Sequence, residues 1–410
     1  MSQNGFDVTV YEKNEKENMG HDWEDCIGRS ILNEIGLNVD EFNLKPFDNI
    51  CYCTPDKTVL IKTSKKGVSN LAYIDRKELI KKLISHCEEC GVRFVFGADI
   101  KNAIIKDKKV TGILYTKDGE EFSATGEMVI DGCGINSPVR NSLPAYTGIV
   151  NKIPERDTFN VYRAYYEKKD FPSNYPKYTV YLFHKGNPGL DWVINGDDFV
   201  DVLIGSFGKM KENSVENALS DFRKCYKCLG EKVIRGGTTE QIPVRKPLPI
   251  FTFDGYAAVG DSASMVEPLS GSGINLALKS GYELGEFILS SEKYNTKEAL
   301  YSFQRDFLLN NAPRLINDDI IKHLLTDLGE NTLNEMFRKK VIGIKELGGG
   351  KLNAKDIFDK IKGVITTPSS LSALIIAGKR LATLKSLLNS MPLEYSEAEL
   401  LSWANKYENF

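Results

Sequence analysis

One glycine-rich stretch, Gly260 to Asn275, constrains the fold of this chain more than any other segment. The residues before it, Tyr256 to Val259, are apolar and predict a short buried strand. The residues after Gly273, up to Ile288, predict a helix. A strand that ends in Gly-Asp and leads through a tight loop into a helix can hold a polar, phosphate-bearing ligand. The helix N-terminus presents unpaired N–H groups and the positive end of the helix dipole to such a ligand.

Three residues of this stretch have properties that suit a bound ligand. Asp261 follows the strand and can accept hydrogen bonds from ligand hydroxyls. Gly271 and Gly273 carry no side chain, so the backbone can approach a ligand closely. An ordinary strand–loop–helix connection that binds nothing is the alternative interpretation.

The stretch resembles the second flavin-binding motif of FAD-dependent oxidoreductases in the superfamily of geranylgeranyl reductases and aromatic hydroxylases. In that superfamily the aspartate binds the ribityl chain, and the start of the following helix faces the isoalloxazine ring. The resemblance implies FAD as the cofactor, with Asp261, Gly271, Gly273, Ile274 and Asn275 as cofactor-binding residues.

A second strand end carries a similar motif. Glu127 to Asp131 predicts a buried strand, and Gly132-Cys133-Gly134 follows it. This segment resembles the first Asp-Gly motif of the same superfamily, which implies that Asp131, Gly132 and Gly134 border the cofactor. Two such strand ends, far apart in the sequence, are what a split flavin domain requires.

The N-terminal segment from Phe6 to Glu12 alternates between apolar and polar residues and predicts a strand that ends in an acid. In a dinucleotide-binding unit the acid that closes the second strand hydrogen-bonds the adenosine ribose. Glu12 is the candidate for that role, and a solvated glutamate at a strand end is the alternative.

The fingerprint Gly-x-Gly-x-x-Gly does not occur upstream of this strand, where the family pattern places it. We expect about 25–30 residues of the first βα unit to be absent from the printed sequence, as in a truncated gene model. The pyrophosphate site would then be incomplete. The printed chain is expected to bind FAD poorly, and a chain extended upstream is expected to bind it well.

Two further residues between these motifs are implicated by the resemblance. In geranylgeranyl reductases a cysteine-containing stretch approaches flavin and substrate, and Cys26 resembles that cysteine, although its surroundings depart from Pro-x-x-Cys-Gly. A buried inert thiol is the alternative. Arg76 begins a helix for which Asp75 is the predicted N-cap, and the corresponding arginine of the superfamily lies near the cofactor. Surface pairing is the alternative for Arg76.

The segment from Ile153 to Pro249 changes character and predicts strands rich in aromatic residues. We expect an antiparallel sheet here that forms one wall of a substrate pocket. The segment around Trp192 resembles the Tyr-x-Trp-x-Phe-Pro segment of geranylgeranyl reductases, with Ile194-Asn195 in place of Phe-Pro. The resemblance makes Trp192 a candidate for lining an apolar substrate, and an aromatic residue of the strand core is the alternative.

The C-terminal region predicts helices at 296–311, 314–328, 332–344 and 369–389. The last of these has an apolar stripe flanked by Lys379, Arg380 and Lys385. Docking of this stripe on the protein body is the favoured interpretation. Peripheral membrane contact through 369–390 is the alternative, and it would suit a lipid substrate.

Composition excludes several classes of protein. The chain has 410 residues and a net charge of −3, and it has no basic arm of the kind that binds nucleic acid. Its eight cysteines are scattered among predicted helices and strands, which favours reduced thiols and a cytoplasmic protein. The two Cys-x-x-Cys pairs, at Cys87 and Cys225, lie too far apart in the sequence to predict a metal site.

The combined prediction is an α/β flavoprotein with an N-terminally incomplete Rossmann-like FAD-binding domain, an inserted antiparallel β-sheet substrate domain and a helical C-terminal region. The resemblance implies reduction of carbon–carbon double bonds in an isoprenoid or lipid substrate, with electrons from reduced nicotinamide or ferredoxin. A flavin-dependent monooxygenase, hydroxylase or halogenase and a truncated, non-catalytic remnant are the alternatives. The expected boundaries are 1–45, 73–145 and 246–295 for the FAD-binding domain, 46–72 and 146–245 for the sheet domain, and 296–410 for the helical region.

Overall fold

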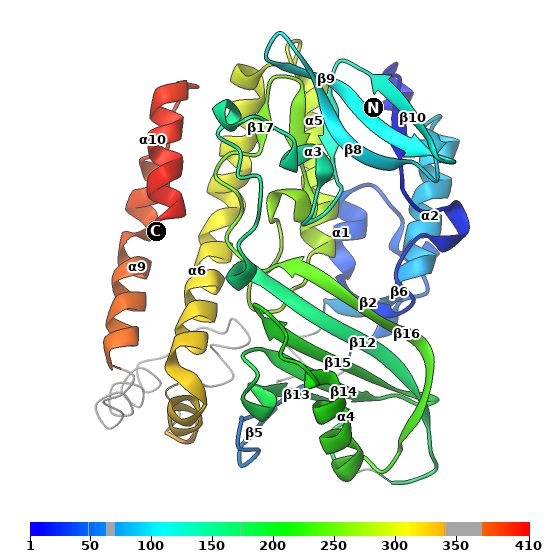
Figure 1. The fold of residues 1–410 in the computed structure, drawn as a ribbon, viewed down its shortest axis with the longest axis vertical. Coiled ribbons are helices and arrows are strands. Elements are labelled where there is room, and N and C mark those ends of the chain that lie inside the picture. The colour runs from blue at the N-terminus through cyan, green and yellow to red at the C-terminus, as the bar shows by residue number, and fades with distance from the viewer. Residues whose placement is uncertain (48, 63–69, 173, 340, 342–370) are drawn as a thin grey trace.

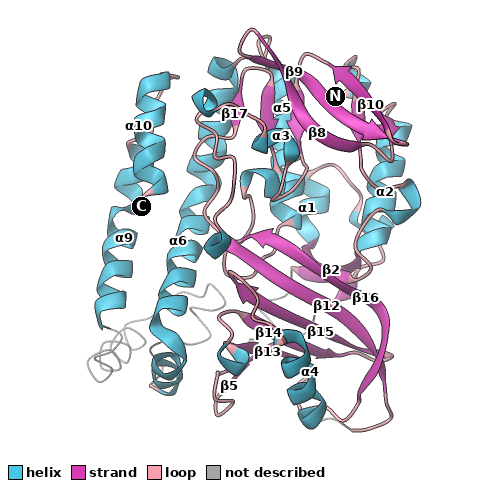
Figure 2. Ribbon diagram, viewed as in Figure 1, coloured by secondary structure: helices cyan, strands magenta, loops and turns pink. Residues whose placement is uncertain are grey.

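The computed structural model describes residues 1–47, 49–62, 70–172, 174–339, 341 and 371–410. Most strands gather in two regions on one side of the molecule, and the C-terminal helices run along the other side (Figure 1, Figure 2). Within the described residues the strands form five sheets. The architecture is α/β, as the sequence predicts.

A seven-stranded sheet occupies the lower half of Figure 1. The neighbouring strands from the segment 153–249 are antiparallel, as predicted, whereas β4, which comes from an earlier segment, pairs in parallel with β13. The segment that contains β4 precedes most of the chain and reaches the sheet by a long connection, which does not impose an antiparallel direction as a hairpin does. In spatial order the strands are β16 (Leu229–Pro243), β12 (Thr158–Lys168), β15 (Phe199–Phe207), β14 (Leu190–Asn195), β13 (Tyr178–Leu182), β4 (Ile50–Cys53) and β5 (Leu60–Lys62).

The two faces of this sheet have different partners, because successive side chains of a strand point to opposite faces. The outer face packs on α4 (Ser214–Cys225) through an apolar cluster that includes Ala164 and Phe222. The inner face lies against a small antiparallel sheet of β2 (Glu24–Gly28), β6 (Leu71–Asp75) and β3 (Lys45–Pro46). This inner face therefore lies at the boundary between the seven-stranded sheet and the small sheet of β2, β6 and β3.

Three more sheets lie in the upper half of Figure 1. β1 (Thr9–Tyr11) pairs in parallel with β7 (Arg93–Val95). β11 (Val129–Asp131) pairs in parallel with β18 (Tyr256–Ala258), and β17 (Thr252–Phe253) extends this pair on the other edge of β18. An antiparallel meander is formed by β8 (Asp99–Lys106), β9 (Lys109–Lys117) and β10 (Glu120–Thr125).

Four helices follow strands at the places where the candidate ligand-binding segments lie. The predicted N-cap of the helix that begins at Arg76 is confirmed, since the Asp75 side chain accepts a hydrogen bond from the Glu78 N–H at 3.1 Å. The predicted helix after Gly273 is also confirmed. These helices are α1 (Arg29–Glu34), α2 (Arg76–Glu89), α3 (Pro138–Asn141) and α5 (Ile274–Ser290).

The C-terminal helices α6 (Lys297–Arg338), α9 (Leu371–Asn389) and α10 (Glu397–Glu408) form the layer at the left of Figure 1. The predicted break at Pro313 is wrong, because α6 continues through this residue. Buried Ala312 and Leu315 on either side anchor the helix in the core, and this packing outweighs the lost backbone hydrogen bond. Only Gly329 departs from helical geometry, with φ of 70°. Residues 340 and 342–344 of the predicted third helix lie outside the described residues.

The apolar stripe expected on 369–390 is divided between two faces of α9. Ala377, Leu384 and Leu388 are buried toward the protein, whereas Leu371 and Ile375 are each 48% exposed. Residues 369 and 370 lie outside the described part. No helix among the described residues has the length and apolar character needed to cross a bilayer.

Candidate functional site

The two predicted strand-end motifs lie side by side, because β11 and β18 are parallel neighbours. Asp131 closes β11, is 1% exposed and receives four protein hydrogen bonds. The donors are Ser137 Oγ at 2.5 Å, Tyr256 Oη at 2.8 Å, Cys133 N at 2.9 Å and Ser262 Oγ at 3.1 Å. Both carboxylate oxygens are thus occupied, so Asp131 orients the turn that follows it, and contact with a ligand is left to the turn itself.

The turn after Asp131 is open on one side. A Cβ atom placed on Gly132 or Gly134 would meet no heavy atom within 4 Å. Gly134 has φ of 81°, which favours glycine, and its N–H donates to Ser262 Oγ at 2.8 Å. The predicted cofactor-binding glycines therefore border free space.

Glu12 stands near this turn but is turned toward its own loop. Its Oε1 accepts hydrogen bonds from the backbone and side-chain nitrogens of Asn14 at 2.8 and 2.7 Å. The pKa of the Cys133 thiol is raised by burial, by Asp131 and more weakly by Glu12. A sugar hydroxyl would compete with Asn14 for this carboxylate.

Asp261 is the least satisfied acid of the site. Neither of its carboxylate oxygens has a hydrogen-bond donor among the described residues, and burial raises its pKa to about 6, although Arg76 opposes this shift. A Cβ atom on Gly273 would lie 3.0 Å from Asp261 Oδ1, so glycine is what allows the start of α5 to approach the carboxylate. A ligand hydroxyl could supply the missing hydrogen bond.

The first turn of α5 is tied to β2. Asn275 Oδ1 accepts a hydrogen bond from Gly28 N at 3.1 Å, and Ile274 packs on the apolar cluster around Ile27. Gly271 has φ of 72°, and a Cβ atom on it would lie 3.4 Å from Ile242 Cδ1 and 3.5 Å from Phe159 Cδ1 on the inner sheet face. The loop thus joins the candidate cofactor site to that face.

Arg76 and Cys26 lie on the small sheet and its helix. Arg76 Nη1 donates to Asp25 Oδ2 at 3.2 Å, and its Nε is buried without a hydrogen-bond partner in the described structure. Cys26 is half-buried, and burial together with Asp25 and Glu267 raises its pKa to about 12. The thiol is neutral at pH 7, so Cys26 can line the site but is not a ready nucleophile.

Trp192 lies on the inner face of the seven-stranded sheet, in β14. Its cross-strand neighbours are Val180 and Leu203, and its ring packs edge-on against Tyr178 at 6.1 Å between centroids. The indole Nε1 is buried without a hydrogen-bond partner in the described structure. Trp192 therefore packs among apolar and aromatic side chains of this face, and its role in lining a substrate stays a prediction.

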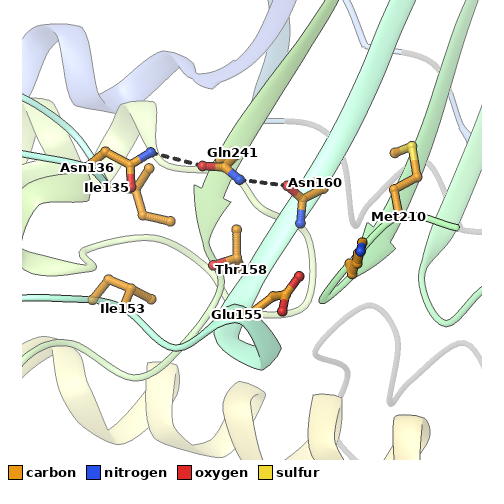
Figure 3. Close-up of a pocket in the computed structure, with 9 residues that line it drawn as sticks. Ile135, Asn136, Ile153, Glu155, Thr158, Asn160, Met210 and Gln241 are labelled. Carbon is orange, nitrogen blue, oxygen red and sulfur yellow. Dashed lines mark hydrogen bonds between the residues drawn. The ribbon is translucent and has the colours of Figure 1, made fainter. Parts of the chain in front are cut away.

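A separate cavity of about 330 Å³ lies at one end of the same sheet (Figure 3). A row of amides crosses it: Asn136 Nδ2 donates to Gln241 Oε1, and Gln241 Nε2 donates to Asn160 Oδ1, both at 2.9 Å. These amides hydrogen-bond one another, and the charged side chains of Glu155 and Lys209 also line the cavity. Its lining residues are Ile135, Asn136, Ile153, Glu155, Thr158, Asn160, Lys209, Met210 and Gln241.

Sequence reasoning missed the polar residues that hold these parts together. Tyr256 and Ser262 satisfy Asp131, and Arg163 connects the inner sheet face to Asp25. A single arginine within an aromatic strand was a signal for Arg163, but its partners come from other strands whose register the sequence does not show.

No protein-family model matches the chain. A digeranylgeranylglycerophospholipid reductase of Sulfolobus acidocaldarius is 23% identical over 403 residues, covering 94% of this chain and 87% of that protein. A reductase of the same name from Methanocella arvoryzae is 22% identical and covers 91% and 93% of the two chains.

Solved structures show the same fold. A geranylgeranyl bacteriochlorophyll reductase-like protein of Thermoplasma acidophilum has a TM-score of 0.72 at 19% identity, covering 92% of this chain and 94% of that one. A myxobacterial FAD-dependent chondrochloren halogenase has a TM-score of 0.61 at 16% identity, covering 99% and 92%. By sequence the chain is similar to proteins named digeranylgeranylglycerophospholipid reductase, and its fold is the one shared by the geranylgeranyl bacteriochlorophyll reductase-like protein and the FAD-dependent halogenase.

Proposed function

We propose that this protein is an FAD-dependent oxidoreductase that reduces carbon–carbon double bonds of an isoprenoid lipid. The observation that carries this proposal is the position of Gly271 beside the inner sheet face, where a Cβ atom on this glycine would lie 3.4 Å from Ile242 Cδ1 and 3.5 Å from Phe159 Cδ1. Through it the glycine-rich turn beside Asp261 is continuous with an apolar wall. The names of the relatives, digeranylgeranylglycerophospholipid reductases, support the lipid as the substrate class.

The residues of the site fit a flavin. Within the part of the chain that the structure describes, the Asp261 carboxylate has no hydrogen-bond donor and so is free for ribityl hydroxyls, and Arg76 Nε is buried without a partner. Gly132 and Gly134 border free space on the neighbouring turn. We assign the ribose to Glu12, and the isoalloxazine ring to the turn and helix start formed by Gly271, Gly273, Ile274 and Asn275.

When bound, FAD supplies a hydride to one carbon of the double bond. The protein holds the isoprenoid chain against the wall that includes Trp192, and the apolar side chains exclude water from it. The second carbon takes a proton from a nearby acid or from water, so that one C=C becomes CH–CH. The electron pair consumed in this reduction would come from reduced nicotinamide or ferredoxin. We assign 1–45, 73–145 and 246–295 to cofactor binding, 46–72 and 146–245 to the substrate wall, and 296–410 to a supporting helical region.

Mass spectrometry tests the activity. The flavin-loaded protein, reduced with dithionite under anaerobic conditions, is incubated with a digeranylgeranylglycerophospholipid, and each reduced double bond adds about 2 Da, the mass of two hydrogens. The proposal would be contradicted if protein that carries dithionite-reduced flavin leaves the mass of the lipid unchanged. Oxygen-dependent addition of one oxygen atom to a substrate would instead identify a monooxygenase.

The exposed face of α9 is proposed to contact a lipid surface. Ile375 and Ile376 are 48% and 55% exposed, and the helix contains Lys379, Arg380 and Lys385 but no acidic residue. This combination suits an anionic bilayer. We expect flotation with phosphatidylglycerol vesicles that exceeds flotation with phosphatidylcholine vesicles. The Ile375→Glu/Ile376→Glu variant should lose it, and Leu114→Glu, on exposed β9, should not. Equal flotation of both variants would refute this contact.

A further inference from the structure

Arg163 joins the two walls of the candidate site. It lies on the inner face of β12 and is 4% exposed. Its guanidinium makes a two-point contact with Asp201 of β15, at 3.1 Å from Nε and 2.7 Å from Nη2. It also crosses to β2, where Nη1 donates to Asp25 Oδ1 at 3.0 Å and Nη2 donates to the Glu24 carbonyl at 2.7 Å. One side chain thus binds both the large sheet and the small one.

Aromatic rings enclose this guanidinium. Its central carbon lies 5.1 Å from the ring centroid of Trp192 and 5.5 Å from those of Trp23 and Tyr165. The rings exclude water, which strengthens the ion pairs and the cation–π contacts. The position of the Trp192 indole is therefore linked to the position of Arg163.

The ionic contacts continue from Asp25 to the cofactor side. Asp25 Oδ2 accepts hydrogen bonds from Arg76 Nη1 and Trp23 Nε1, both at 3.2 Å. The charges therefore alternate in sign from the large sheet to the start of α2, in the order Asp201, Arg163, Asp25 and Arg76.

We propose that Arg163 is a positioning residue that holds the Trp192 wall in register with the flavin site, and this inference rests on the proposed function. Arg163 fixes Asp25, the neighbour of Cys26, against the sheet that carries Trp192. A substrate chain lying on that wall is thereby held at a fixed distance from the cofactor. A displacement of about 1 Å at this point can lower a reaction rate about 100-fold.

The variant Arg163→Lys tests this role. Lysine keeps the buried positive charge but lacks the planar fork, so it cannot hold Asp201 in a two-point contact and also reach Asp25. Arg223→Lys is the matched control, because Arg223 packs over Tyr166 on the outer face and donates to the Gly230 carbonyl. For each protein we would measure the flavin Kd, the Tm, kcat and KM with the lipid, and hydrogen exchange of β2.

We expect Arg163→Lys to lower kcat at least tenfold with a flavin Kd within twofold of wild type, and to speed exchange in Glu24–Gly28. Arg223→Lys should change none of these. Unaltered kcat together with unaltered exchange in Arg163→Lys would overturn the inference. A general fall in Tm with loss of flavin would also overturn it, because that result would mean that Arg163 only stabilises the fold. If wild-type protein does not reduce the lipid, the proposed function fails. Hydrogen exchange of β2 then tests the inference by itself: faster exchange in Arg163→Lys at unchanged Tm would show that Arg163 positions this strand, and unaltered exchange would show that it does not.

Discussion

Ser262 donates a hydrogen bond of 3.1 Å to the carboxylate of Asp131, and so joins the segments that follow two parallel strands. The same hydroxyl oxygen accepts the N–H of Gly134 at 2.8 Å. Ser262 and Asp131 are both buried. One serine therefore fixes the distance between the two glycine-containing turns that are proposed to hold the flavin.

Replacing this serine should weaken both stability and cofactor binding. Ser262→Ala leaves the Gly134 N–H without its acceptor and removes one donor from Asp131. We expect the free energy of unfolding to fall by about 1–3 kcal/mol, the cost of a buried unpaired polar group. Urea denaturation and flavin titration measure the two effects. The exposed Ser302→Ala on α6 is the control, and an equal loss in both variants would refute the specific role of Ser262.

Asp261 should make stability depend on pH. Its pKa in the folded protein, about 6, lies above the ordinary value of 3.8 because of burial. The acid therefore favours the flavin-free fold below pH 4, and this contribution is lost as the pH rises through 6. We expect Asp261→Asn to abolish this loss of stability with rising pH. The variant should therefore be more stable than wild type at pH 7 without flavin, by at most about 3 kcal/mol, and should bind flavin more weakly.

Thermal unfolding of flavin-free protein between pH 4 and 7.5 measures this effect. Asp99→Asn, at an exposed site, is the control and should follow the wild-type curve. Parallel pH curves for wild type and Asp261→Asn would show that this carboxylate carries no burial cost.

Gly273 should matter for cofactor binding more than for folding. A methyl group on it would press on Asp261 Oδ1 at 3.0 Å and on Val266 at 3.3 Å, so the carboxylate must move. We expect Gly273→Ala to weaken flavin binding about tenfold, equivalent to about 1.4 kcal/mol. Gly281→Ala in the same helix has open space around it and should leave the flavin Kd unchanged. Equal Kd values for the two variants would contradict the prediction.

Cys26 should be dispensable as a nucleophile. With its pKa raised to about 12 by burial, the thiol stays protonated at pH 8 and should resist iodoacetamide in the folded protein. Peptide mass spectrometry would locate the modified cysteines, with protein unfolded in guanidinium as the reactive control. Cys26→Ala should keep at least a third of the turnover, and a hundredfold loss would restore a chemical role for this residue.

His184 should stabilise the outer side of the large sheet. Its Nδ1 lies 2.7 Å from Asp191 Oδ2 and its Nε2 lies 2.9 Å from Asp221 Oδ2, and the histidine is buried. His184→Gln removes the charged partner of buried Asp191, whereas Asp221 keeps its ion pairs with Lys57 and Lys185, so we expect a loss of about 3 kcal/mol in urea denaturation. His86→Gln, at an exposed helix position, should cost less than about 0.5 kcal/mol. A loss that small in His184→Gln would show that the pair is not needed.

The sequence alone determined the elements that depend on local chemistry. The apolar run before Gly260 and the paired glycines after it specify a strand, a turn and a helix, because these choices depend on neighbouring residues. Asp75 as a helix cap was predictable for the same reason. These local patterns were enough to locate the two strand ends that form the candidate flavin site.

Only the tertiary structure decided how polar groups are shared between distant segments. Among the described residues it gave Asp131 four protein donors and Asp261 none, although both acids lie at strand ends beside glycine. It also placed Arg163 between Asp201 and Asp25, and carried α6 through Pro313. The physical reason is that hydrogen bonds and packing across strands depend on register and burial, and neither is a property of a residue's neighbours in sequence.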